Sequence, residues 1–203
     1  MMDQRNIDML HEQLTKFKEH RWHHHNERDM TPMLMSVWRD SGQVNCGLAE
    51  LANLAGERAR LGDLIRYAVQ TVCGVALEVN GFKMPPPPAC MVAVTPGDQL
   101  EALYFATESY VRSASDMDKA EVIQHGDLSA DFKMNPATTV TEQLQMTVWT
   151  RDAVGGVDTQ TVAQPFSIDD GGVILWGERR NYDDADVGGD VQDKVLPLFE
   201  EFS

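Results

Sequence analysis

Three segments in the second half of the chain combine strand-forming residues with glycine-containing turns, and they constrain the fold more than any other feature. They span 142–152, 157–168 and 172–180. In the first segment Leu144, Met146 and Val148 fall on one side of an extended chain, and the residues between them fall on the other. Glycine in the two separators tolerates the positive φ of tight turns. The pattern predicts a three-stranded antiparallel meander.

Two tryptophans lie within this meander. Trp149 belongs to the first of its strands and Trp176 to the third segment. We expect the two rings to face each other across neighbouring strands and to pack in the core. The alternative is that they are exposed near Met33 and Met35 and anchor a partner protein.

The N-terminal part of the chain has helical periodicity. Within residues 3–27 the apolar positions recur at three- and four-residue steps, as Ile7, Leu10, Leu14 and Phe17. Two further helical pieces are expected in 48–72, and a short apolar helix near the C-terminus. Strands are expected in 32–43 and 73–82.

One segment is compatible with two structures. Residues 100–113 satisfy both a helical and an extended pattern. We favour a strand, because the segment follows the turn residues Pro96, Gly97 and Asp98.

These elements predict the α+β class, with N-terminal helices packed on a largely antiparallel β-sheet that ends in the three-stranded meander. We expect a single domain over 1–203. It would comprise an N-terminal helix in 1–30, a mixed helix and sheet body in 31–180, and an acidic loop with a C-terminal segment in 181–203.

The charge balance narrows the classes of partner. The chain has 32 acidic and 17 basic residues, a net charge of −15. Such a surface repels nucleic acid and anionic membranes, so we expect neither as a direct partner. A protein with a basic surface is the more natural partner, although acidity that serves solubility alone would give the same composition.

Cysteine usage and hydropathy bear on the compartment. The three cysteines are far apart and form no C-x-x-C pair, which favours a reducing environment. The N-terminus resembles no signal peptide, and no apolar run reaches the roughly 18 residues of a membrane span. We expect a cytoplasmic protein. Its composition is common among accessory proteins of bacteria and phages.

A histidine cluster at the end of the first helix is the strongest candidate for metal chemistry. On a helix that continues to residue 27, the side chains of His20, His23, His24 and Glu27 fall in neighbouring turns. Imidazole and carboxylate ligands suit Zn²⁺ or a similar ion. The same sector faces away from the apolar stripe, so we favour a solvated or interface face as the explanation of the cluster, with a pH-responsive patch as a further alternative.

Other signs of catalysis are weak. The sequence contains neither a G-x-S-x-G elbow nor a phosphate-binding glycine loop, and residues 183–193 do not fit a calcium loop. His125 and Asp127 form the one further candidate acid–base pair, which would suit a hydrolase.

We therefore expect a non-enzymatic acidic interaction or assembly protein, a homo-oligomer or a subunit of a complex, with no cofactor. The alternative is a metal-binding regulator or metal-dependent enzyme built on the histidine cluster, with a divalent metal as its cofactor.

Overall fold

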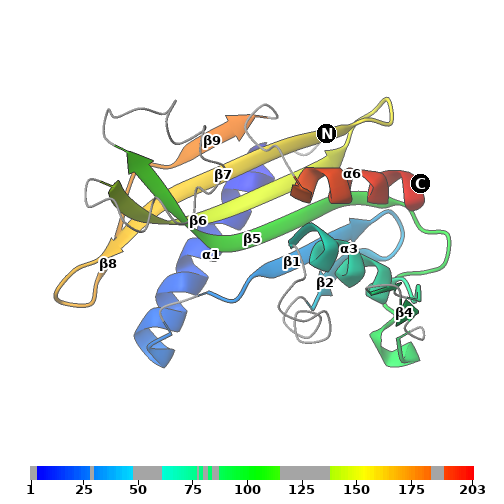
Figure 1. The fold of residues 1–203 in the computed structure, drawn as a ribbon, viewed down its shortest axis with the longest axis horizontal. Coiled ribbons are helices and arrows are strands. Elements are labelled where there is room, and N and C mark those ends of the chain that lie inside the picture. Colours follow the sequence, from blue (N-terminus) through cyan, green and yellow to red (C-terminus); the bar gives the residue numbers. More distant parts are fainter. Residues whose placement is uncertain are drawn as a thin grey trace.

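An antiparallel sheet with helices on both faces forms the described part of the molecule (Figure 1). The structure is a computed structural model that describes residues 4–27, 30–47, 61–76, 78–79, 82–83, 87–114, 138–183 and 190–203. The helical elements are α1 (Gln4–His25), α3 (Leu61–Val72), the 3-10 turn η1 (Ala89–Met91) and α6 (Asp190–Glu201). The strands are β1 (Met33–Trp38), β2 (Gly42–Cys46), β3 (Glu78–Val79), β4 (Phe82–Lys83), β5 (Leu100–Ala114), β6 (Thr138–Arg151), β7 (Val157–Ile168), β8 (Ile174–Trp176) and β9 (Arg180–Asp183).

The main sheet has the strand order β2-β1-β5-β6-β7-β8, and β9 also pairs with β7. Every neighbouring pair is antiparallel, and β3 with β4 forms a separate small sheet. The longest pairing joins β5 to β6, from Ala102↔Thr150 to Ala114↔Thr138. The predicted α+β class and the C-terminal meander are confirmed, and 100–113 is strand.

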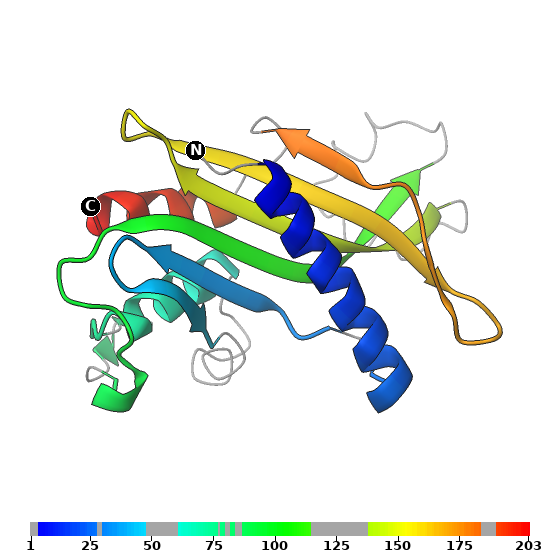
Figure 2. The ribbon, with the colours of Figure 1, turned by 180° about the vertical axis from the view of Figure 1, so that it is seen from behind.

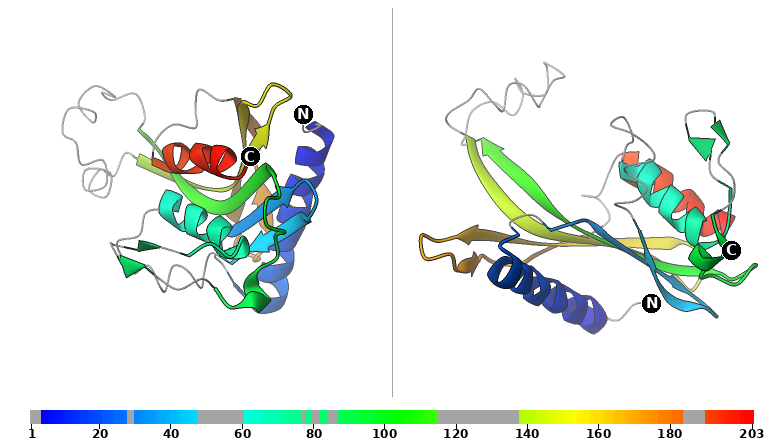
Figure 3. Two further views of the ribbon diagram at one scale, coloured as in Figure 1. Left: turned by 90° about the vertical axis from the view of Figure 1, so that its right-hand side faces the viewer. Right: turned by 90° about the horizontal axis from the view of Figure 1, so that it is seen from below.

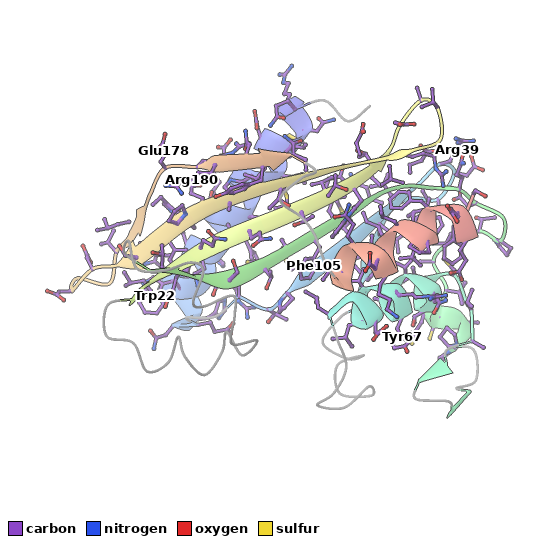
Figure 4. All side chains as sticks on the ribbon, turned by 45° about the horizontal axis from the view of Figure 1, so that its top comes forward. Trp22, Arg39, Tyr67, Phe105, Glu178 and Arg180 are labelled. Atoms are coloured by element: carbon purple, nitrogen blue, oxygen red, sulfur yellow. The ribbon has the colours of Figure 1, made fainter. Side chains whose placement is uncertain are left out.

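Helices α3 and α6 cover one face of the sheet (Figure 3). Their buried side chains include Ile65 and Val69 of α3 and Leu198 of α6, which pack with Leu103 and Trp149 of the sheet in one apolar cluster. All five of these side chains are fully buried. Phe105 and Tyr67 lie in the same layer (Figure 4). We call this side of the sheet the two-helix face.

Helix α1 covers the opposite face and runs across the strands (Figure 2). Ile7 and Leu14 of α1 pack against Leu144, Met146 and Val148 of β6. These three side chains alternate along β6 with Gln145, Thr147 and Trp149, as the sequence predicted. We call this side the one-helix face.

The predicted pairing of two tryptophans is wrong. Trp149 is opposite Thr159 on β7, whereas Trp176 is opposite Phe166 on the other side of the same strand. Strand β7 therefore separates β6 from β8. Trp149 packs on the two-helix face and Trp176 on the one-helix face.

Smaller differences from the sequence-based expectations concern the ends of elements. Residues 32–43, expected as one strand, contain β1, a turn at 39–41 and the start of β2. Part of the segment expected as an acidic loop after residue 180 forms β9. The first of the two helical pieces expected in 48–72 lies mostly outside the described residues, as do His125 and Asp127.

Candidate functional site

Helix α1 presents a mixed line of side chains to the sheet. Its buried residues are Ile7, His11, Leu14 and Lys18, which follow each other at three- and four-residue steps. The apolar stripe predicted from the sequence differs, because Leu10 is only partly buried and Phe17 is 39% exposed. The helix is therefore rotated so that a histidine and a lysine lie underneath it, and two apolar side chains lie along its flank.

One flank of α1 is attached to the β7–β9 side of the sheet by polar contacts. The Trp22 indole donates a hydrogen bond to the carbonyl oxygen of Gly172 over 2.6 Å, and the Trp176 indole donates to Glu19 over 2.7 Å. Arg179 pairs with Asp8. At the start of the helix, Gln160 donates to the amide oxygen of Gln4 over 2.9 Å. These contacts explain why α1 is rotated away from the orientation that its apolar stripe predicts.

A buried ion pair lies beneath α1. The Lys18 ammonium pairs with the carboxylate of Glu108 on β5, and their side chains are 0% and 10% exposed. The same ammonium lies 4.9 Å from the centre of the Phe166 ring. Removing one partner of such a pair leaves an uncompensated charge in a dry environment, so the pair fixes the position of α1 over β5.

His11 is the second polar residue under the helix. It is 2% exposed, and its Nε2 atom has no hydrogen-bond partner. Burial, followed by the charge of Arg179, lowers the pKa of His11 from 6.5 to about 4, while Asp8 acts in the opposite sense. The imidazole is therefore neutral near neutral pH.

The other flank of α1 borders an apolar groove of about 310 Å³, which we call the α1 groove. The helix forms one wall, and strands β1, β2, β5 and β6 form the floor and the other wall. Its lining residues are Leu10, Gln13, Leu14, Phe17, Met33, Leu34, Met35, Asn45, Tyr104, Ala106 and Met146. None of the eleven is charged, in a chain of which 24% is charged.

The lining of the α1 groove suits an apolar ligand of variable shape. Met33, Met35 and Met146 are among the lining residues, and methionine side chains adapt to different surfaces because they are unbranched and polarisable. Phe17 and Met33 are 39% and 36% exposed, so part of the wall faces solvent. Burial raises the pKa of Tyr104 above its ordinary value of 10.0.

The predicted metal ligands lie beyond this groove, where α1 ends. The expectation that the helix continues through residue 27 is wrong: α1 ends at His25 and Asn26 has a positive φ, so Glu27 lies outside the helix. His20, His23 and His24 are exposed, and the rings of His20 and His24 are 4.4 Å apart. The carboxylate of Glu27 pairs with Arg21. Among the described residues, no group of three or more histidine, cysteine, aspartate or glutamate side chains is placed to hold a metal ion. The metal site remains a prediction.

The cysteines offer little chemistry. Cys46 is buried, and burial raises its pKa. Burial raises the pKa of Cys73 to about 12, so this thiol is protonated near neutral pH. Cys90 is exposed, on η1.

The α1 groove was not identified from the sequence. The available signal was indirect: Leu10 and Phe17 on the helix, with Met33 and Met35 on the first strand, are apolar side chains that the structure leaves partly exposed. Only the polar contacts on the opposite flank show why they remain partly open.

Comparisons with known proteins add no assignment. Protein-family models, curated proteins and solved structures contain no match to this chain. In the part of the chain that the structure describes, no helix combines the length and the apolar character needed to cross a membrane.

Proposed function

We propose that the protein is a non-enzymatic binding protein whose α1 groove takes up an apolar segment of a partner protein with a basic surface. The observation that carries this proposal is the uncharged, methionine-containing groove on a strongly acidic chain. Apolar pockets with a few polar groups are the usual form of binding sites.

The distribution of charge supports a basic partner. Residues 4–27 contain four basic and four acidic residues, so the net charge of −15 comes from the rest of the chain. An acidic surface increases the rate of encounter with a basic protein, because long-range attraction steers association. An apolar segment then gains affinity by leaving water in the groove. Charge and groove thus serve two successive steps of one binding event.

The first experiment identifies the partner. A photo-crosslinking amino acid replaces Gln13, which lines the α1 groove, or Glu12, which is exposed beside it on the same helix. Both proteins are irradiated in a lysate of the native host, and cross-linked proteins are identified by mass spectrometry. We expect a basic protein that is captured from position 13 and not from position 12.

The second experiment measures binding of that purified protein by calorimetry. Phe17→Asp introduces a charge into the groove and should weaken binding at least about tenfold. Met9→Asp is the matched control, because Met9 is 51% exposed on the same helix and does not line the groove. Affinity should also fall as salt rises. Equal losses for both variants, or affinity that rises with salt, would contradict the proposal.

A further inference from the structure

Strand β2 forms one edge of the main sheet (Figure 2). It pairs with β1 from Leu34↔Cys46 to Trp38↔Gly42, and no other strand among the described residues pairs with it. In the part of the chain that the structure describes, the backbone groups on its outer side therefore have no strand partner. Such an edge is a template for association unless the sequence protects it.

Strand β2 lacks the usual protection. Its sequence, GQVNC, contains no charged residue and no proline. The opposite side of the sheet is different: β9 begins at Arg180 and ends at Asp183, and Glu178 lies just before it (Figure 4). Charged residues on edges oppose strand-to-strand association. The other strand at that edge, β8 (Ile174–Trp176), is uncharged but only 3 residues long, and very short edge strands offer little for pairing. Strand β2 is therefore the longer uncharged strand at these two edges.

Charge also selects the occupant of this edge. Two copies of a chain with a net charge of −15 repel each other over most of their surfaces. They can approach only where the surface is neutral. Strand β2 is neutral, and its Asn45 also lines the uncharged α1 groove.

The sequence of β2 is complementary to itself. When two copies pair antiparallel about a two-fold axis at Val44, Gln43 of one copy lies opposite Asn45 of the other. Both side chains are exposed, and in that register their amides would be within reach of each other for hydrogen bonding. Val44 of one copy lies opposite Val44 of the other, on the side of the sheet where α3 packs.

We propose that the protein is a homodimer in which two copies join their sheets through β2, in antiparallel register about Val44. The α1 grooves of the two copies then lie on the same face of one continuous sheet, beside each other at the axis. This proposal concerns the edge strand and does not depend on what the groove binds.

The test uses the full chain and sedimentation equilibrium. Wild-type protein should be dimeric at micromolar concentration. Gln43→Lys combined with Asn45→Lys places lysines opposite each other twice, and should weaken the dimer at least about tenfold. This variant reduces the net negative charge of each copy, so general charge repulsion would have the opposite effect.

Two further variants give the result its specificity. Gln43→Lys combined with Asn45→Glu places opposite charges across the same register, and should restore association to within a few fold of wild type. Asn181→Lys, an exposed position on β9, should leave the dimer unchanged. Circular dichroism verifies that each variant is folded, which we expect because the substituted side chains are exposed.

Three results would overturn the dimer. The first is a wild-type chain that stays monomeric at about 100 µM, where even a weak specific dimer forms. The others are a double-lysine variant that dimerises as wild type does, and an opposite-charge variant that dissociates. Salt separates this proposal from the proposed function. Added salt should strengthen the dimer, since repulsion between acidic copies is screened, and should weaken binding of a basic partner. Phe17→Asp should likewise affect partner binding and leave the dimer intact.

Discussion

The two faces of the sheet are built on different principles. On the two-helix face, sixteen described residues form one apolar cluster, and both helices contribute aliphatic or aromatic side chains to it. On the one-helix face the corresponding cluster has eight residues, and the covering helix also buries His11 and Lys18. The first face is closed by apolar packing, whereas the second is held at one flank by polar contacts.

This difference explains why a groove lies beside α1. Apolar packing brings both sides of a helix equally close to the sheet, because the burial of apolar surface has no preferred direction. Directed contacts such as Arg179 with Asp8 and Trp176 with Glu19 fix one side of a helix. The other side of the helix stays apart from the sheet, and its apolar side chains Leu10 and Phe17 remain partly exposed.

The largest expected effect is on the two-helix face. Trp149 is 0% exposed there, and Trp149→Ala should reduce the free energy of unfolding by about 4 kcal/mol, through lost burial and the cavity left behind. Urea unfolding followed by circular dichroism measures it. Phe17→Ala on the groove wall should cost about 1 kcal/mol or less. Similar losses for the two variants would contradict the distinction between the faces.

The buried ion pair gives the next largest effect. Lys18→Ala leaves the Glu108 carboxylate buried without its partner, and should reduce the free energy of unfolding by about 3 kcal/mol. The matched control is Lys16→Ala, which removes an exposed pair with Glu12 and should cost less than about 0.5 kcal/mol. Lys18→Met combined with Glu108→Gln should recover most of the stability. A failure of this double variant to recover would indicate that the pair supplies stability itself.

His11 makes the one-helix face sensitive to acid. Its pKa is 6.5 in an unfolded chain and about 4 in the folded protein, so the unfolded state takes up the proton first. The stability that the folded state has with a neutral His11 is fully present above pH 6.5, and it is lost as the pH falls towards 4. At pH 5 the loss should be about 2 kcal/mol.

Urea unfolding at pH 7 and pH 5 measures this loss. His11→Leu should remove that part of the pH dependence, and His20→Leu, at an exposed position, should retain it. Identical pH profiles for wild type and His11→Leu would rule out His11 as the cause.

The smallest effect is expected on the outer face of α1. His20→Ala should change the free energy of unfolding by less than about 0.5 kcal/mol, because its side chain is exposed. The same variant tests the metal hypothesis. Elemental analysis of untagged wild-type protein should show substoichiometric metal; one equivalent of zinc that disappears in His20→Ala would favour the alternative function.

Local patterns in the sequence were sufficient for most elements. The alternation of Leu144, Met146 and Val148 defines which side of β6 faces α1, because a strand has a fixed two-residue period. The helical steps of the N-terminal segment likewise predict a helix within 3–27, and α1 spans Gln4–His25. Such features depend on neighbouring residues only.

The rotation of α1 and the faces of the two tryptophans depend on distant residues. Lys18 is buried because Glu108, ninety positions away in the chain, provides its counter-charge, and no local pattern contains that information. Trp176 faces α1 because the length and register of β7 place it opposite Phe166. The α1 groove depends on both the buried ion pair and the register of the strands, which is why the sequence did not predict it.

Strand β5 contributes to both layers at once. Leu103 and Phe105 enter the two-helix cluster, while Tyr104 and Ala106, which alternate with them, belong to the one-helix cluster and line the α1 groove. A slip of one residue against β6 would exchange these sets and spoil both cores together. The shape of the α1 groove is thus tied to packing on the reverse side, and substitutions can reshape the groove without loss of either core only where they leave the register of this strand unchanged.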